Sequence, residues 1–313
     1  MIMNVNLLNV LTEIKSDFRG YVFTGKLVKT ILIKAIPQLE HYFKPSSEPK
    51  LIHISPLYKG TQDKKKCIYS YVQCKNSGYT IKCEGEPVLV HLNGSFYFYL
   101  GFHSSIVKIH DVVQALVDYA ECFDFMNKRV CVRVLGVEFP NVHELGLNVA
   151  KKALESGAIK VVFSSPTMLR DPLRTSGKFK TLLPSPFNVF ATPVYTILFS
   201  KGLCSVRRLR TELLRLHRLF NETYSVLGGL KIRWVYYSKR PEPALIGYVN
   251  YRVNYEYLDF LKQGLNVEEW LGEVFAYTLA LGVGAGRATG FGHVEIKPLV
   301  DRGSSGGSSV ERL

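Results

Sequence analysis

The sequence predicts an α+β protein built from two tandem ferredoxin-like domains. Each half of the chain contains apolar segments in the order strand, helix, strands, helix, strand, which is the order of a split βαβ unit. The length of 313 residues suits two domains of ordinary size. Hydrophobic residues make up 47% of the chain, which is enough to give each domain a full core.

Hydrophobic periodicity predicts the elements of the first half. The segment 3–14 alternates apolar and polar residues, as a half-buried strand does. Apolar residues then recur with helical spacing over 23–39, where Pro37 weakens the last turn. The remaining elements are strands expected at 50–55, 67–74, 94–102 and 129–139, and a second helix expected at 106–122.

The second half follows the same order, without a repeat that is visible in the residues themselves. Strands are expected at 159–164, 231–237, 244–253 and 292–296, and helices at 205–224 and 267–281. Pro241 and Pro243 indicate a turn between two of the strands, and 141–157 is expected to form a short helix and linker. We therefore place an N-terminal domain at 1–146, a C-terminal domain at 147–300 and a flexible polar tail at 301–313.

The chain is strongly basic. Its 40 Lys and Arg residues against 26 Asp and Glu residues give a formal net charge of +14. This balance favours a polyanionic partner, because each cation near a phosphate releases condensed counterions. Base stacking is one use for the 18 Tyr and 18 Phe residues, although core packing is the commoner one.

The cysteines and the apolar runs set further limits. The six cysteines contain no Cys-x-x-Cys pair, so we expect no zinc site and no other cofactor. No apolar run reaches the roughly 18 to 20 residues that span a bilayer, and the first residues lack the charged start of a signal peptide. We therefore expect a cytoplasmic protein without membrane contact, whose cysteines are mostly reduced and buried.

The most informative segment is GVGAGRATGFG, from Gly282 to Gly292. Glycine tolerates positive φ and lacks a Cβ, so the loop could bring backbone N–H groups close to a phosphate chain, with Arg287 as the cation. The order helix, glycine loop, strand does not fit a P-loop, which ends in Lys-Ser/Thr, or a Rossmann fingerprint, which follows a strand. The alternative is a tight helix-to-strand turn that binds no ligand.

Three lysines form a candidate catalytic set. Lys26 and Lys29 share one face of the first helix, and Lys50 opens the strand that returns beside it in the expected fold. Ammonium groups around one phosphate stabilise the charge of a pentavalent transition state and protonate a leaving 5′ oxygen. Neighbouring cations lower the pKa of a lysine and so make it a better acid. The alternative is that all three are solvated surface residues.

Three histidines are further candidates, because imidazole titrates near neutrality. His41 ends the first predicted helix, His53 lies in the strand that follows, and His293 comes directly after the glycine loop. Nothing in their spacing indicates a metal site. Each alone is more often a structural histidine.

Two segments carry concentrated positive charge. The helix 206–218 contains five arginines and forms a basic patch. Lys239 and Arg240 lie at the tip of a predicted hairpin, from which long side chains can reach a groove. For both segments the alternative role is solubility.

Taken together, four places resemble the CRISPR repeat-processing endoribonucleases, the sixth family of CRISPR-associated (Cas) proteins. The glycine loop resembles the C-terminal signature of the repeat-associated RNA-binding superfamily, and Ser165-Pro166-Thr167 resembles the Ser-Pro-Thr segment that starts the second domain. The segment 182–185 and the apolar helix after it resemble archaeal members. The pair of segments 24–29 and 49–52 resembles the first helix and second strand.

The resemblance implies two ferredoxin-like domains that bind a CRISPR repeat RNA and cut it without a metal ion. The RNA 2′ hydroxyl attacks the adjacent phosphate, leaving a 2′,3′-cyclic phosphate and a 5′ hydroxyl. Arg287 matches a loop arginine of the family, and Arg240 approximately matches a hairpin arginine. The RNA-binding residues expected from the resemblance and the basic segments are Ser165, Thr167, Lys239, Arg240, Gly286, Arg287, Gly290 and Gly292.

The active-site residues depart from the commonest family pattern. Many members use a histidine near the end of the first helix, a tyrosine on that helix and a lysine on the next strand. Lys50 matches the lysine, but Ile33 occupies the tyrosine position. His41 aligns with the histidine only through a gap, and Lys44 is the gapless match. Other archaeal members rely on lysines and arginines, which favours the three-lysine set, with Lys29 as the general acid and His41 as its rival.

We therefore expect a metal-independent endoribonuclease that matures CRISPR RNA, with the repeat RNA as its partner. Other Cas proteins of an effector complex and a second copy of the chain are further candidate partners. The rival hypotheses are a noncatalytic RNA-binding subunit of such a complex and a general basic RNA-binding protein outside CRISPR.

Overall fold

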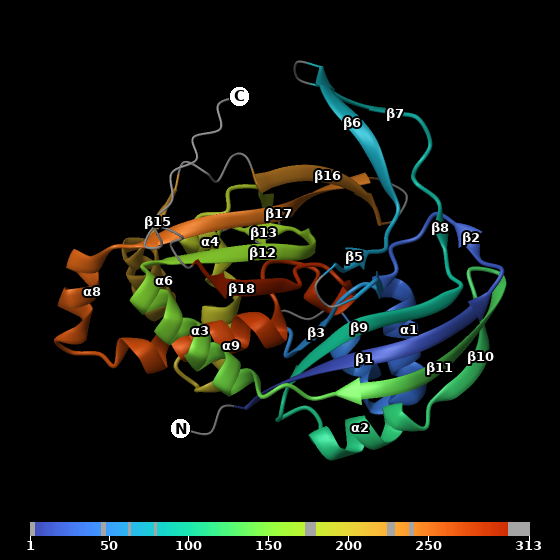
Figure 1. The fold of residues 1–313 in the computed structure, drawn as a ribbon, viewed down its shortest axis with the longest axis horizontal. Helices are drawn as coiled ribbons and strands as arrows, with labels where there is room; N and C mark the ends of the chain where they lie inside the picture. Colours follow the sequence, from blue (N-terminus) through green and yellow to red (C-terminus); the bar gives the residue numbers. More distant parts are fainter. Residues whose placement is uncertain are drawn as a thin grey trace, which may run out of the picture.

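The computed structural model describes residues 4–44, 48–61, 64–77, 80–172, 180–223, 229–237 and 241–299. Two large antiparallel sheets and the helices that flank them form the two halves of the molecule (Figure 1). Both sheets contain the four-strand order of a ferredoxin-like fold, so the predicted fold class is confirmed.

In the N-terminal sheet the ferredoxin-like strands run in the order β11–β1–β9–β3, with bounds Lys128–Glu138, Val5–Ser16, Gly94–His103 and Ile52–Ile54. Helices α1 (Gly25–Ala35) and α2 (Ile109–Val117) share one hydrophobic core with alternate residues of β1. This alternation is the period-two pattern that predicted the strand. The sheet is completed by β4 (Tyr58–Lys59), β5 (Lys66–Cys67) and β10 (Ala120–Phe125), while β2 (Arg19–Gly20) and β8 (Val90–His91) form a separate two-stranded sheet.

The C-terminal sheet repeats the same order as β18–β12–β17–β16, with bounds Val294–Pro298, Ala158–Thr167, Pro241–Val253 and Leu230–Tyr236. The short strand β15 (Phe220–Glu222) also pairs with β17, and β13 (Leu169–Arg170) pairs with β14 (Lys180–Thr181). Its helices are α3 (Val142–Ser156), α4 (Pro186–Val189), α5 (Ala191–Ser200), α6 (Val206–Leu219), α8 (Tyr255–Lys262) and α9 (Val267–Leu281). Helix α9 has the predicted bounds and is buried along most of its length.

One hairpin of the N-terminal half joins the C-terminal sheet. The hairpin of β6 (Tyr71–Ser77) and β7 (Thr80–Glu84) comes from the N-terminal half, but β6 pairs with β16 at the edge of the C-terminal sheet. In Figure 1 the base of this hairpin lies beside the right-hand end of β16, and the hairpin rises above it. The division of the chain near Gly146 remains a prediction, and that position falls inside α3.

Three predicted helices end earlier than expected. Helix α1 ends at Ala35 and is followed by the short helix η1 (Pro37–Phe43), whereas a strand follows each of the other two. Helix α2 ends at Val117, and 120–125 forms the strand β10. Phe123 and Phe125 are buried at alternate positions, which is the pattern of a strand and not of a helix. Helix α6 ends at Leu219, and the residues that follow pair with β17 as β15. The predicted turn at Pro241 and Pro243 is also wrong, since both residues lie within β17 opposite β16.

The prediction of reduced cysteines is wrong for four of the six. Cys74 pairs with Cys83, and Cys122 pairs with Cys131. Each pair joins residues that face each other directly across an antiparallel hairpin, β6–β7 and β10–β11 respectively. A search for Cys-x-x-Cys spacing misses both disulfides, because their cysteines are nine residues apart in the sequence. Cys67 and Cys204 are free.

The two domains touch through a close contact between β9 and α9. A Cβ built on Gly101 of β9 would lie 1.6 Å from the carbonyl oxygen of Ala280 in α9. No real Cβ reaches such a distance, so the strand can lie against the helix backbone only because residue 101 is glycine. Val5 and Leu7 of β1 extend this contact, because both belong to the core of the C-terminal domain.

We predict that Gly101→Ala lowers the free energy of unfolding by roughly 3 kcal/mol, because the added methyl group forces β9 and α9 apart. Chemical denaturation measures this change. Gly136→Ala is the matched control, since Gly136 lies in β11 of the same sheet and a Cβ there would meet nothing within 4 Å. Equal stability of the two variants would contradict the tight contact.

Candidate functional site

The glycine loop, Gly282 to Gly292, is folded tightly into the junction between the domains. Its glycines have positive φ values, and four of them, Gly282, Gly284, Gly290 and Gly292, allow close backbone approach. A Cβ on Gly292 would lie 2.0 Å from the carbonyl oxygen of Val283 within the loop, and a Cβ on Gly290 would lie 2.9 Å from the Cα of Gly25 in α1. The loop therefore brings the C-terminal domain against the N-terminal end of α1. Within the loop, the short helix η2 (Arg287–Thr289) also contacts β3.

Arg287 is at the centre of this junction and not at its surface. Its side chain is 4% exposed and donates two hydrogen bonds of 2.8 Å, one to the carbonyl oxygen of Leu281 and one to that of Lys50. Burial lowers the pKa of the guanidinium to about 10, so it stays charged at neutral pH. We call this contact the arginine bridge. It corrects the expectation that Arg287 faces a phosphate, because both hydrogen bonds go to the backbone.

Ser165 and Thr167 also support the loop from within. The hydroxyl of Ser165 accepts a hydrogen bond of 2.8 Å from the backbone N–H of His293, and the hydroxyl of Thr167 donates to the carbonyl of Ser165 at 2.9 Å. Both side chains are buried. A direct contact with RNA, as expected for this Ser-Pro-Thr segment, is therefore not available in this arrangement. Gly290 and Gly292 are buried as well, whereas Gly286 is half-buried.

The three predicted lysines lie around the same junction. Lys26 and Lys29 are half-buried on α1, and Lys50 is half-buried just before β3. Burial lowers the pKa of Lys26, and burial together with the nearby charge of Lys29 lowers the pKa of Lys50. The backbone of Lys50 is held by the arginine bridge, while its ammonium group donates to the carbonyl oxygen of Lys44. The structure thus brings Lys29 and Lys50 together.

Aromatic rings border the lysine cluster on two sides. The ammonium group of Lys29 lies 5.5 Å from the ring centroid of Phe43, and that of Lys26 lies 4.8 Å from the ring of Tyr237. Phe43 belongs to the short helix η1 (Pro37–Phe43), which also carries His41. His41 is exposed and its ring lies against Tyr42 at 3.6 Å. The predicted rival acid is therefore accessible, on the same short helix as the ring that lies beside Lys29.

Two predicted RNA-binding residues, Lys239 and Arg240, lie outside the described residues. The chain reaches them directly after Tyr237 and Ser238. Of the described residues on either side, Tyr237 packs beside the junction. Pro241 begins β17.

The sequence named His53 and His293 as separate candidates, but it did not show that they contact each other across the domain junction. His53 of β3 and His293, just before β18, lie with Nε2 and Nδ1 3.2 Å apart, although 240 residues separate them in the chain. His53 Nδ1 also lies 3.1 Å from the carbonyl oxygen of Arg287, and the ring of His293 stacks on Tyr99 at 4.2 Å. Both rings are buried. No local pattern could have indicated a contact between such distant residues.

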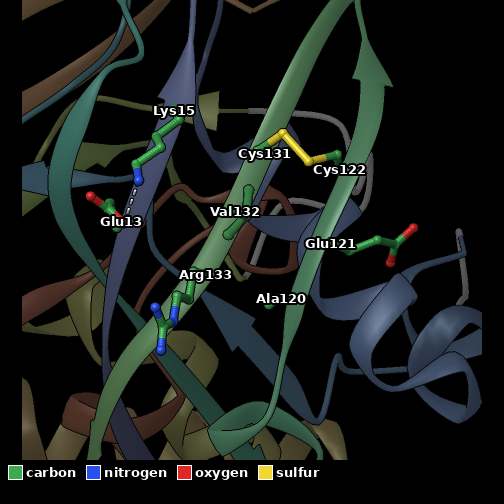
Figure 2. Close-up of a pocket in the computed structure, with 8 residues that line it drawn as sticks. All are labelled: Glu13, Lys15, Ala120, Glu121, Cys122, Cys131, Val132 and Arg133. Atoms are coloured by element: carbon green, nitrogen blue, oxygen red, sulfur yellow. Dashed lines mark ion pairs between the residues drawn. A yellow bond between two sulfur atoms is a disulfide. The ribbon is translucent and has the colours of Figure 1, made fainter.

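A surface hollow lies away from this junction. It has a volume of about 260 Å³ and opens on the N-terminal sheet beside the Cys122–Cys131 disulfide, where the Lys15–Glu13 ion pair of 3.5 Å borders it (Figure 2). Its lining residues are Glu13, Lys15, Ala120, Glu121, Cys122, Cys131, Val132 and Arg133. None of the predicted site residues lines it, so it does not mark the candidate site.

The described residues contain neither a metal-binding cluster nor a membrane-spanning helix. None of them form a group of three or more His, Cys, Asp or Glu side chains placed to hold a metal ion. No helix in the described part of the chain is long and apolar enough to cross a bilayer.

Solved structures of Cas6 proteins share this fold. A Cas6 product complex superposes with a TM-score of 0.58 at 14% sequence identity, covering 95% of this chain and 100% of the other. A Cas6 of Thermus thermophilus gives 0.53 at 14% identity, with coverage of 95% and 99%. A Cas6-related protein from Pyrococcus furiosus gives 0.50 at 9% identity, with coverage of 93% and 98%. No protein-family model and no curated protein matches the sequence. The chain therefore has the tandem ferredoxin-like fold of Cas6 structures over nearly its whole length.

The histidine pair makes stability depend on pH. Burial, with the charge of Arg287, lowers the pKa of His53 to about 3, and burial also lowers the pKa of His293. The folded rings therefore stay neutral, while the unfolded chain takes up protons as the pH falls below about 6.5. The contribution of this neutral pair to the free energy of unfolding is fully present above that pH. It is lost as the pH falls from there towards the folded-state pKa values, by up to ~1.4 kcal/mol per pH unit for each histidine.

We predict that in a double His53→Gln, His293→Gln variant the free energy of unfolding falls much less between about pH 6.5 and pH 5 than in the wild type. Urea denaturation at several pH values measures this difference. The control is His110→Gln, because the side chain of His110 is 82% exposed. An equally steep decline in the double variant would show that other groups cause the pH dependence.

Proposed function

We propose that this protein is an endoribonuclease that cleaves CRISPR repeat RNA without a metal ion. The observation that carries the proposal is the cluster of Lys26, Lys29 and Lys50 at the junction of the two ferredoxin-like domains. The class of substrate is supported by the proteins that share the fold, which include two Cas6 product complexes and a RAMP protein binding different RNA substrates.

The reaction needs no nucleophile from the protein. The 2′ oxygen of the RNA bonds to the adjacent phosphorus as the bond from phosphorus to the 5′ oxygen breaks. The proton of the 2′ hydroxyl passes to solvent, and a lysine gives a proton to the leaving 5′ oxygen. The products are a 2′,3′-cyclic phosphate and a 5′ hydroxyl. The protein therefore supplies position, a proton and positive charge for the pentavalent transition state.

Lys29 and Lys50 divide these tasks in the proposal. The sequence favoured Lys29 as the general acid. The environment of Lys50 adds a reason to consider it for the same role, because burial and the charge of Lys29 lower its pKa and bring its proton closer to transfer at neutral pH. In either assignment the second ammonium group stays charged beside the phosphate, and His41 remains the accessible rival.

The glycine loop and Arg287 act as positioning elements in the proposal. The arginine bridge fixes the backbone of Lys50 relative to the loop, and Gly290 lies against Gly25 at the start of α1, the helix that carries Lys26 and Lys29. A displacement of about 1 Å at a reacting group can cost roughly a hundredfold in rate. The loop therefore serves the chemistry by holding two lysine-bearing segments in register.

The second candidate is a noncatalytic RNA-binding subunit of a CRISPR effector complex. One feature favours it, namely that Ile33 occupies the position where many family members have a tyrosine. The two candidates differ in a gel assay, because the subunit would bind a repeat transcript and leave it intact. A cut at a single phosphate would exclude it.

We predict that a double Lys29→Ala, Lys50→Ala variant loses cleavage of a repeat transcript by at least about a hundredfold, since both the proton donor and the neighbouring charge are removed. It should retain part of the binding affinity through the remaining basic residues. Lys151→Ala with Lys152→Ala is the charge-matched control, because both lysines are exposed on α3. Cleavage by the double variant at the wild-type rate would overturn the assignment.

We also predict that purified protein cleaves at an unchanged rate in excess EDTA. The attacking oxygen belongs to the RNA, and lysine charges replace the Lewis acid that other nucleases use. The rate is compared with that of a Mg²⁺-dependent ribonuclease added to the same buffer, which EDTA must inhibit. Loss of activity in EDTA that Mg²⁺ restores would contradict the proposed chemistry.

A further inference from the structure

The outer face of helix α6 carries positive charge far from the lysine cluster. Leu213, Leu216 and Leu219 are buried and fix one face of the helix against the C-terminal core. With 3.6 residues per turn, the opposite face then presents its arginines to solvent. The exposed arginines are Arg207, Arg208, Arg210 and Arg218.

These four arginines have no acidic partner within the described residues. The fifth, Arg215, differs from them, because it forms an ion pair of 2.7 Å with Glu212. Like charges spaced three or four residues apart on one helix face destabilise that helix. Arg207 and Arg210 have this spacing, and the positive charge of the face as a whole would be compensated by a bound polyanion. From Arg207 to Arg218 the face extends over about 16 Å, which is enough for several consecutive phosphates.

Aromatic rings on the neighbouring helix continue this face. Helix α6 contacts α8, where Tyr257 and Phe260 stack with their ring centroids 5.7 Å apart. The guanidinium of Arg218 lies 6.0 Å from the ring of Tyr257, and the side chain of Phe260 is 63% exposed. An exposed phenylalanine beside arginines gains little from water, whereas a nucleic acid base can stack on it. The carboxylates of α8 are Glu256 and Asp259, and Asp259 pairs with Lys262 at 3.5 Å.

The location separates this surface from the candidate active site. In Figure 1, α6 and α8 lie at the left end of the molecule, and α1, which carries Lys26 and Lys29, lies at the right. We call the exposed arginines of α6 together with Tyr257 and Phe260 the α6–α8 surface. An RNA held at the lysine cluster would have to extend beyond it to reach this surface.

We propose that the α6–α8 surface is a second RNA-binding site, which holds single-stranded RNA through its phosphates and through stacking of at least one base on Phe260. The arginines recognise the backbone of any sequence, and the aromatic rings distinguish RNA from an acidic peptide. The proposal takes RNA as the partner, as the proposed function does, but it does not depend on cleavage.

The test measures binding of a labelled oligouridine of about 20 nucleotides to the full chain by fluorescence anisotropy over a range of salt concentrations. We expect the triple variant Arg207→Gln, Arg210→Gln, Arg218→Gln to bind roughly tenfold or more weakly at about 0.1 M salt. The dependence of log affinity on log salt should become shallower by about two units, because each lost phosphate contact removes about 0.7. Phe260→Ala should weaken binding by roughly fivefold or more without changing that slope.

The control is the triple variant Lys108→Gln, Lys128→Gln, Arg129→Gln, which removes the same charge from exposed positions of the N-terminal domain. Wild-type affinity and slope in the α6 variant would overturn the proposal, as would equal losses in the control. An acidic protein as the true partner would be indicated if Phe260→Ala has no effect and polyglutamate displaces the RNA at equal charge. If the protein binds RNA through the α6–α8 surface but leaves repeat RNA uncut, the proposed endoribonuclease function is wrong and the second RNA-binding site is supported.

Discussion

The arrangement of the two domains depends on one buried cation. The guanidinium of Arg287 lies among backbone groups at the domain junction and donates to the carbonyl oxygens of Leu281 and Lys50. A buried charge is costly unless it is hydrogen-bonded, so this arginine holds its two partners firmly in place. One partner ends α9 of the C-terminal domain, and the other precedes β3 of the N-terminal domain. The bridge therefore connects the lysine cluster to the glycine loop.

Glycines at the contact between the domains are as important for this arrangement as the arginine bridge, because they have no side chain. Gly290 faces Gly25 at the start of α1, and Gly101 faces Ala280 of α9, at distances that exclude a Cβ. These contacts join the domains backbone to backbone and leave the histidine pair His53 and His293 sealed between them. The loop thus acts first as a structural junction. Its effect on RNA, in our proposal, passes through the segments that it holds.

The sequence predicted the fold better than the roles of the site residues. Strong helical periodicity located α9 to the residue, and the order of elements was sufficient for the fold class. The glycine loop was recognised, but glycine content does not reveal whether a loop is exposed or buried, so Arg287 was expected to contact a phosphate chain. Contacts between distant segments left no local pattern, as the pairing of β6 with β16 illustrates. Lys26 and Lys29 were proposed because charge at helical spacing is a local signal, and the catalytic role of the lysines stays a prediction.

The central claim is that Arg287 acts through Lys50 and does not itself bind RNA. The most direct measurement is a single-turnover cleavage titration of repeat RNA with folded Arg287→Met protein, which yields the rate at saturation and the concentration at half-saturation together. Our account predicts a saturating rate lowered by roughly a hundredfold, from misplacement of Lys50, with half-saturation close to that of the wild type. An unchanged saturating rate with a much higher half-saturating concentration would show that Arg287 contacts RNA, and would contradict the account.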